Sequence, residues 1–310
     1  MLPPLEILPG PLYQNPNGAT LAWIQYGGNV SHAKPGVLVI HGGGWNGGSA
    51  ENNVGQTRDI ANAGFFAASV FYELAPNDNT VNGYIPGQPS HELDGTTPGW
   101  RMNLEVNDIK NAVKAMRADP RCNGWVGVVG GSAGATHAIT VALDTNTTPG
   151  DVWPRWFQGG HDDRPDCAVM LSAVYDFSDW TPSIGETRTD PDYVHRGMHN
   201  YAQTIDLTTL AGLALNPVNL VPGAIARGFK PIYMINSRYD NPSAYHQLVT
   251  MVCLLQNSGL TRGTDYDYLT IPGDLHSFQY WDSWDHLPGD PPHTVGDDVI
   301  AFLRTRAGLE

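Results

Sequence analysis

Short apolar runs alternate with stretches of helical periodicity along most of the chain. The runs have the length and β-branched content of buried strands, and they cover residues 37–40, 65–71, 126–129, 167–174, 231–236 and 266–271. Between them, apolar residues recur at helical spacing in the stretches 51–63, 103–116, 135–143, 243–257 and 293–306. Strands that alternate with helices predict an α/β fold, with a mostly parallel, twisted sheet covered by helices on both faces.

Three parts of the chain depart from this alternation. Residues 1–30 hold short alternating runs between Pro and Gly turns, which predict antiparallel edge strands. The stretches 77–100 and 177–229 are long and weakly patterned, which is typical of functional inserts. We therefore predict a single domain over residues 1–310, with both inserts lining a cleft at the C-terminal edge of the sheet. Asn103 is the predicted N-cap of the helix that follows the first insert.

The segment Gly130-Gly-Ser-Ala-Gly134 joins a predicted strand directly to a predicted helix. A serine between glycines at such a turn has the context of a nucleophile elbow, in which the serine adopts a strained backbone and only small neighbours fit. An ordinary Gly-rich turn with an N-cap serine is the alternative. The strand and helix on either side favour Ser132 as a nucleophile.

Two further motifs precede the elbow, His41-Gly-Gly-Gly-Trp45 and Tyr72-Glu-Leu-Ala-Pro76, and each follows a predicted strand. In this order the three motifs resemble the α/β-hydrolase superfamily, most of all its hormone-sensitive-lipase-like carboxylesterases and the related bacterial feruloyl and acetyl-xylan esterases. The resemblance covers residues 35–305 and implies the α/β-hydrolase fold. The sequence departs from the family at Ala135, where many relatives carry glycine, and in the length of 77–100.

Acyl transfer requires an activated nucleophile, a base held in one tautomer and donors for the developing oxyanion. In this fold the acid and then the histidine follow the serine along the chain. His276 lies in a loop after a predicted strand and is the predicted base, with a surface-loop histidine as the alternative. Asp240, after the strand at 231–236, is the predicted acid. Asp176, at the end of the preceding strand, is the rival for that role.

The oxyanion donors are expected to be main-chain N–H groups, because these need no reorganisation when charge develops. The glycines after His41 allow the backbone to approach a substrate as no residue with a side chain could. We predict an oxyanion hole made by the N–H groups of Gly43, Gly44 and Ala133. A Gly-rich turn that serves only as a strand exit is the alternative. Trp45 is expected to pack under this loop as a core residue.

The charge balance excludes some classes of partner. With 17 Lys and Arg against 31 Asp and Glu, the formal net charge of −14 argues against nucleic acid and against anionic membrane surfaces. The chain contains no run of 18 apolar residues, so we expect no membrane span. His161, Asp162 and Asp163 have metal-binding residue types without a spacing that would converge them on an ion. We therefore expect no metal and no cofactor.

The three cysteines and the chain ends bear on the compartment. Cys122 and Cys167 are expected at the entries of neighbouring strands and could form a disulfide, or Cys167 could be a core residue and Cys122 an exposed thiol. Cys253 is expected in the core. The sequence begins without a signal-peptide pattern, and Leu309-Glu310 is typical of vector-derived residues, so we expect an exported enzyme, secreted or periplasmic, whose leader has been removed. A cytoplasmic location is the alternative.

The motifs together predict a serine carboxylesterase that works through a Ser-His-Asp triad and an acyl-enzyme. The inserts contribute aromatic and polar residues and no long apolar lid, so we expect a small-molecule or oligosaccharide ester of plant-polymer origin, feruloyl or acetyl. A serine peptidase or an arylformamidase on the same fold is the first alternative, because a triad does not determine the leaving group. A non-catalytic binding module is the second. The oligomeric state stays open.

Overall fold

A computed structural model describes residues 32–74, 100–143, 163–179, 201, 216–283 and 292–309, together with short strands within the first 26 residues. The predicted insert at 77–100 lies outside the described residues except for Trp100. Within the predicted insert at 177–229, the structure describes 177–179, 201 and 216–229. The cleft walls predicted from these inserts therefore stay a prediction.

Eight strands form the central sheet, in the order β1-β4-β6-β5-β7-β8-β9-β10. In chain order they are β1 (Glu6–Ile7), β4 (Trp23–Tyr26), β5 (Lys34–Ile40), β6 (Phe66–Val70), β7 (Cys122–Gly131), β8 (Cys167–Leu171), β9 (Ile232–Ser237) and β10 (Tyr266–Ile271). Six neighbouring strands of the sheet are parallel, namely β6, β5, β7, β8, β9 and β10. The strands β1 and β4 join antiparallel at one edge. Both predictions, a mostly parallel sheet and antiparallel edge strands, are confirmed. The strands β2 (Tyr13–Gln14) and β3 (Thr20–Leu21) pair separately.

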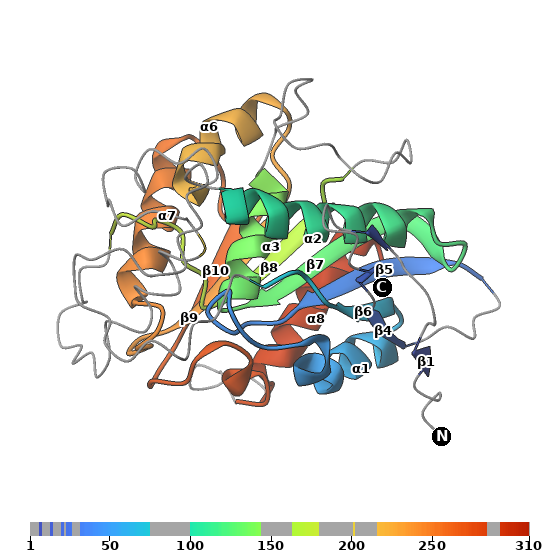
Figure 1. The fold of residues 1–310 in the computed structure, drawn as a ribbon. Coiled ribbons are helices and arrows are strands. Elements are labelled where there is room, and N and C mark those ends of the chain that lie inside the picture. Colours follow the sequence, from blue (N-terminus) through green and yellow to red (C-terminus); the bar gives the residue numbers. More distant parts are fainter. Residues whose placement is uncertain are drawn as a thin grey trace, which may run out of the picture.

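Helices cover both faces of the sheet (Figure 1). The helices α2 (Trp100–Ala118), α3 (Ala133–Leu143), α6 (Pro217–Ala226) and α7 (Tyr245–Asn257) lie on one face. The helices α1 (Val54–Asn62) and α8 (Val295–Ala307) lie on the other. Two short 3-10 helices, η1 (Ala50–Asn53) and η2 (Ser277–Tyr280), complete the described elements.

One prediction about helices is wrong, and one helix was not predicted. Asn103 is not an N-cap, because α2 begins at Trp100 and already buries Met102 against the sheet. The helix α6 lies within the stretch 177–229, which was described as weakly patterned and for which no helix was predicted. Its missed signal is Pro217 at the first helical position, where the fixed φ of proline suits a helix start and the absent N–H is not needed.

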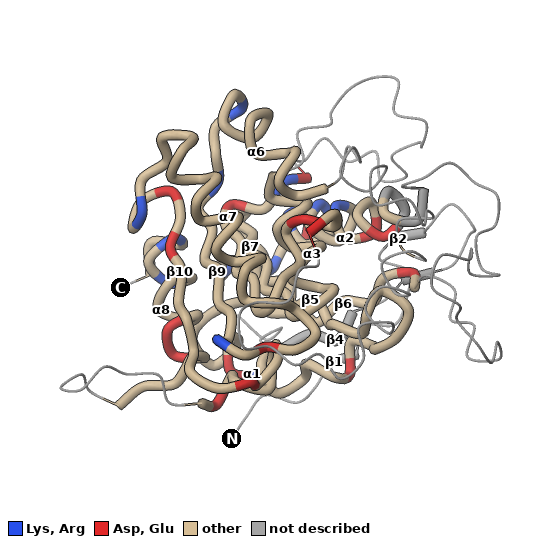
Figure 2. Tube along the Cα trace, turned by 90° about the vertical axis from the view of Figure 1, so that its left-hand side faces the viewer, with Lys and Arg blue, Asp and Glu red and all other residues tan. Residues whose placement is uncertain are grey.

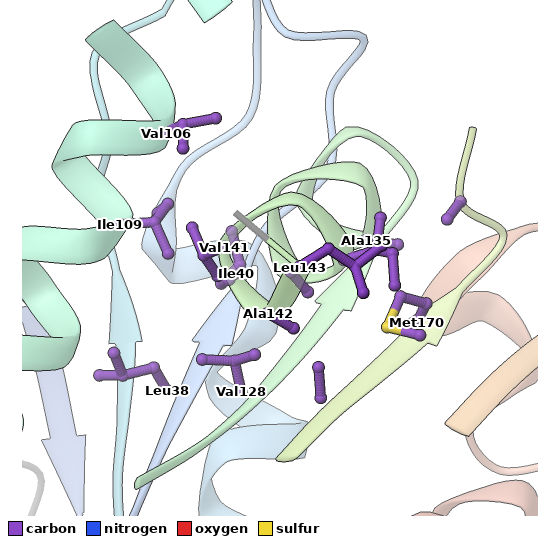
Figure 3. Close-up of a cluster of buried hydrophobic side chains, with 14 of the residues drawn as sticks. Leu38, Ile40, Val106, Ile109, Val128, Ala135, Val141, Ala142, Leu143 and Met170 are labelled. Carbon is purple, nitrogen blue, oxygen red and sulfur yellow. The ribbon is translucent and has the colours of Figure 1, made fainter. Parts of the chain in front are cut away.

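The central strands are apolar on both sides because both faces of the sheet are covered. Along β5, Val37 and Val39 face α1 and α8, whereas Leu38 and Ile40 face α2 and α3. Figure 3 shows the second of these cores, in which strand residues meet side chains of α2 and α3. The strands β7, β8 and β9 contain no charged residue, and Figure 2 shows charged positions on the surrounding helices and loops and on the edge strand β10. No described helix is both long enough and apolar enough to cross a bilayer.

The strand register brings several loops to one edge of the sheet. In the parallel pair β5 and β7, Ile40 lies opposite Gly130, so the chain leaves both strands at the same level. After β6 the chain crosses over to the other side of β5 to form β7, which reverses the direction in which strands are added. Ligands bind at such switch points in open α/β sheets, outside the C-terminal ends of the strands. The loops after β5 and β7 open at this point.

The register also excludes one of the two alternatives for the cysteines, a disulfide between Cys122 and Cys167. The strands β7 and β8 are neighbours as expected, but Cys167 pairs with Gly127. Cys122 pairs with Lys34 of β5 and Gly127 with Val37, so the two levels are three residues of β5 apart, on the order of 10 Å at about 3.3 Å per residue. A disulfide needs Cα atoms closer than about 7 Å. All three cysteines are free. Cys167 is a core residue as expected, whereas Cys122 is buried and Cys253 is exposed, opposite to both predictions.

Candidate active site

Ser132 lies in a strained turn between β7 and α3. Its φ is +56°, in the left-handed region that a residue with a side chain occupies at a cost of about 1–3 kcal/mol. The Ser132 N–H donates to Leu171 O at 2.8 Å, and its carbonyl oxygen accepts from Ala135 N at 2.9 Å. Strand β8 and the first turn of α3 therefore hold the serine from both sides, and its side chain stays partly exposed.

The glycines around Ser132 are required by close backbone contacts. A Cβ at Gly130 would collide with the carbonyl oxygen of Gly134 across the turn. A Cβ at Gly134 would collide with the carbonyl oxygens of Ile40 and His41 at the end of β5. The Gly-x-Ser-x-Gly pattern thus follows from how tightly the turn closes and how closely it packs on β5.

The structure brings two of the predicted residues into direct contact. The Nδ1 atom of His276 lies 2.9 Å from Oδ1 and 3.0 Å from Oδ2 of Asp240. Asp240 is fully buried, and the His276 side chain keeps 19% of its surface exposed. Asp240 also accepts a hydrogen bond from Ser243 N at 2.9 Å. A carboxylate bound at Nδ1 keeps the proton on that nitrogen and leaves Nε2 as the basic position of the ring.

Asp176 has a different set of partners. Its Oδ1 atom accepts hydrogen bonds from the backbone N–H and the hydroxyl of Ser178 and from Asn216 Nδ2, at 2.9, 2.7 and 3.0 Å. Asn216 is the residue that precedes α6. The Asp176 carboxylate therefore ties the loop after β8 to the start of α6.

The loop that carries His276 packs directly on the elbow. A Cβ at Gly131 would collide with the Ser277 hydroxyl and would lie 2.6 Å from the ring of Phe278. Ser277 has a φ of +58°, and its N–H donates to Ser172 Oγ at 2.9 Å. These contacts fix the backbone that follows His276 relative to Ser132.

Two buried hydroxyl groups beneath this loop were not predicted from the sequence to belong to the site. Ser172 Oγ lies 3.1 Å from Tyr280 OH, which donates to Ile235 O at 3.1 Å. Because the tyrosine hydroxyl donates to the carbonyl, Ser172 donates to the tyrosine while it accepts from Ser277. Ser172 and Tyr280 are 108 residues apart, so no local pattern could have linked them.

The loop after β5 runs along the other side of the elbow. A Cβ at Gly42 would lie 2.9 Å from Ser132 Cβ and 2.8 Å from Gly131 O. Gly43 and Gly44 have φ values of +134° and +60°. No backbone carbonyl in the described part of the chain accepts from the N–H groups of these two glycines. Ala133 begins α3, so its N–H belongs to the first helical turn, which has no acceptor within the helix.

Histidines and acidic residues elsewhere do not form a metal site among the described residues. No group of three His, Cys, Asp or Glu side chains lies close enough to hold an ion in the ranges that the structure covers. His41, at the start of the glycine loop, is buried, and this burial lowers the pKa of its imidazole. The ring is therefore neutral at pH 7, and its Nδ1 atom lies 2.8 Å from Gly42 O.

Several solved esterases share this fold at low sequence identity. An acetyl ester-xyloside bifunctional hydrolase from Caldicellulosiruptor lactoaceticus aligns with a TM-score of 0.67 and 15% identity, over 100% of this chain and 99% of that chain. A truncated form of a carbohydrate esterase from gut microbiota aligns with a TM-score of 0.64 and 14% identity, over 99% and 97% of the two chains. A hyperthermophilic esterase from Pyrobaculum calidifontis aligns with a TM-score of 0.64 and 17% identity, over 99% and 86%.

No protein-family model matches the sequence, and no curated protein sequence matches it. Three features indicate the same fold: the mostly parallel sheet with a crossover at β5, the turn between β7 and α3, and the likeness to these structures. The chain has the α/β-hydrolase fold.

Proposed function

We propose that the protein is a serine carboxylesterase that uses Ser132, His276 and Asp240. The observation that carries the proposal is the contact between His276 Nδ1 and the buried Asp240 carboxylate, in a loop that packs on the Ser132 elbow. A buried carboxylate on Nδ1 and a strained serine between glycines are the two features that acyl transfer requires of its base and its nucleophile.

The reaction follows from these positions. Ser132 Oγ attacks the ester carbonyl carbon while His276 Nε2 accepts the hydroxyl proton, and Asp240 stabilises the imidazolium that forms. The carbonyl oxygen becomes an oxyanion, which accepts hydrogen bonds from the N–H groups of Gly43, Gly44 and Ala133. The C–O bond to the alcohol then breaks, and His276 gives its proton to the departing oxygen.

Water completes the cycle by the same steps. His276 takes a proton from a water molecule, whose oxygen attacks the acyl-serine carbonyl. The second tetrahedral intermediate collapses, the bond to Ser132 Oγ breaks, and the serine recovers its proton from His276. The products are one carboxylic acid and one alcohol.

The proposed substrates are acetyl or feruloyl esters of small molecules or oligosaccharides. Support comes from the names of the similar structures, which include an acetyl ester-xyloside hydrolase and a carbohydrate esterase. The acidic chain, with a net charge of −14, suits uncharged ester substrates better than anionic ones.

The proposal is tested with Ser132→Ala and a matched control, Ser258→Ala, which removes an exposed serine at the end of α7. Short p-nitrophenyl esters, methyl ferulate and acetylated xylan serve as substrates, with a peptide and an N-formyl aryl amine as the competing classes. We expect Ser132→Ala to lower kcat by roughly 10⁴-fold or more and the control to be unchanged. A fluorophosphonate should label Ser132 in the wild type, as read by peptide mass. Turnover above a few per cent in Ser132→Ala, or preferred cleavage of the amides, would refute the proposal.

A further inference from the structure

The first end of the glycine loop is held by a tyrosine. The Tyr72 hydroxyl donates to His41 O at 3.0 Å. The Tyr72 ring also stacks on the His41 imidazole, with ring centroids 4.3 Å apart and planes inclined by 15°. Both side chains are buried. The point at which the chain leaves β5 and enters the loop is therefore fixed in position and in orientation.

The C-terminal end of the loop is held by a second tyrosine. Trp45 has a φ of +65°, a left-handed conformation that is uncommon for a bulky residue and must be stabilised by its surroundings. Its indole stacks on the Tyr201 ring, with centroids 5.1 Å apart and planes inclined by 14°. Phe177 packs against both rings, at 5.8 Å from each. Burial of the indole among these rings offsets the backbone strain.

The two tyrosines meet at one buried histidine. The Tyr201 hydroxyl lies 3.2 Å from His137 Nδ1, and the Tyr72 ring meets the His137 ring edge-on at 4.7 Å. His137 Nε2 lies 3.1 Å from a carboxylate oxygen of Glu105, and neither side chain is exposed. A neutral ring with its proton on Nε2 lets Nδ1 accept from the Tyr201 hydroxyl and places the Nε2–H beside the Glu105 carboxylate. Burial lowers the pKa of His137 to about 3, which agrees with a neutral ring.

We propose that His137 is a positioning residue that orients the oxyanion loop through Tyr72 at its first end and Tyr201 at its last. The inference rests on the proposed function, because the loop matters as a source of oxyanion donors. His137 lies on α3, five residues after Ser132. The helix α3, which begins directly after the nucleophile, therefore also carries His137, and His137 contacts the two tyrosines that hold the ends of the loop. Through these contacts the nucleophile and the oxyanion donors keep one relative position.

A packing role alone does not account for these residues. A buried polar pair such as His137 and Glu105 loses hydration from both partners, and apolar side chains of similar volume are often as stable or more so. The network of hydrogen bonds from Tyr72 to His41 O and between Tyr201 and His137 fixes one arrangement of these side chains, because hydrogen bonds are directional. The network therefore contributes more to the position of the loop than to the free energy of unfolding.

The test compares two buried tyrosines. Tyr201→Phe removes the hydroxyl that contacts His137 and keeps the ring that stacks on Trp45. Tyr175→Phe is the matched control, because Tyr175 is equally buried and its hydroxyl makes no hydrogen bond with any described residue. We measure kcat and KM on p-nitrophenyl butyrate, the inhibition constant of phenylboronic acid, which forms a tetrahedral adduct at the serine, and Tm.

We expect Tyr201→Phe to lower kcat by about 5–20-fold with KM within about twofold, because oxyanion donors act in the transition state. Its affinity for the boronic acid should fall by a similar factor, and Tyr175→Phe should match the wild type in kcat, KM and inhibition constant. Glu105→Gln, which keeps the size of the side chain beside His137 Nε2, should retain more than half of kcat, whereas Glu105→Ala should not.

Each outcome has one meaning. An active wild type in which Tyr201→Phe and Tyr175→Phe have equal kcat and equal boronic acid affinity would overturn the positioning role alone. A loss confined to KM, or a Tm drop with kcat per fluorophosphonate-labelled serine unchanged, would also overturn it. A wild type that neither hydrolyses esters nor labels at Ser132 would overturn the proposed function, and this inference with it. If Glu105→Ala does not fold, the Tyr201→Phe result decides.

Discussion

The two loops that flank Ser132 are held in different ways. The loop after β5, from His41 to Trp45, is fixed by stacked rings at both ends, with two tyrosines that contact His137. The loop after β10 is fixed through its backbone. Ser277 N donates to Ser172 Oγ, and Leu275 O accepts from the Ser237 hydroxyl.

The difference matches what each loop has to do in the proposed reaction. Oxyanion donors are backbone groups that work best when they do not move, and rigid stacked rings serve that purpose. His276 must accept and release protons, so its ring needs contact with substrate and water. Hydrogen bonds to the residues beside it hold the backbone while the side chain remains 19% exposed. The first loop therefore holds its backbone donors in fixed positions, whereas the second holds its backbone and leaves the His276 ring in contact with solvent.

The largest expected effect removes Asp240, the acid after β9 that contacts His276 of the second loop. Asp240→Asn should lower kcat by about 10³–10⁴-fold, because an amide does not hold His276 in the required tautomer or stabilise the imidazolium. Asp176→Asn is the matched control and should stay within about threefold, because its side-chain oxygen can still accept from Ser178 and Asn216. Kinetics per labelled serine check both variants. If Asp176→Asn is the one that loses activity, Asp176 is the acid.

The next effect compares the two loops by steric insertion. Gly131→Ala places a methyl group against Ser277 and 2.6 Å from the Phe278 ring, which displaces the His276 loop. Gly42→Ala places one 2.8 Å from Gly131 O, between the glycine loop and the elbow. Displacements approaching 1 Å at a reacting group cost about 10²-fold. We expect kcat/KM to fall by about 10²-fold in Gly131→Ala and about 10-fold in Gly42→Ala.

The control for both glycines is Gly55→Ala in α1. A Cβ at Gly55 would meet no atom within 4 Å, so this variant should keep full activity and gain about 0.5–1 kcal/mol of stability from helix propensity. Urea unfolding measures the gain. Equal activity in all three variants would show that neither loop needs the close approach seen at the elbow.

The smallest effect concerns the support beneath Tyr72. Asp108 on α2 is buried and accepts a hydrogen bond from Glu73 N at 2.9 Å, next to the tyrosine. Burial raises the pKa of Asp108 from 3.8 to about 8. The folded state therefore retains a proton that the unfolded state has lost, and the stability this contributes is full below pH 4 and is lost as the pH rises through about 8.

Asp108→Asn removes this dependence, because the amide stays neutral and keeps an acceptor for Glu73 N. We expect the Tm of the variant relative to wild type to rise between pH 5 and pH 8, by roughly 2–4 °C for each kcal/mol involved. Differential scanning calorimetry at several pH values checks this. At each pH, kcat of the variant is expected to agree with kcat of the wild type within about twofold. Wild-type and variant Tm curves that run parallel would contradict the raised pKa.

Local patterns determined much of the fold. The strand β10 occupies the predicted residues 266–271, and the turn at Ser132 lies between the predicted strand and helix. These features depend on residues close together in the chain, through periodicity, strand length and the space that glycine leaves. The places of Asp240 and His276 after their strands could also be predicted, because parallel strands bring their C-terminal ends to one edge.

Only the tertiary structure decided how distant segments meet. Neighbouring strands β7 and β8 were predicted, but their register sets Cys167 opposite Gly127 and keeps it from Cys122. The contact of His137 with Tyr201, across 64 residues, has no local signal. Periodicity reports which face of an element is buried, whereas register and packing decide which side chain of another element lies against it. The protein's sequence by itself therefore determined most of its elements and its candidate catalytic residues, and the fold decided what holds those residues in place.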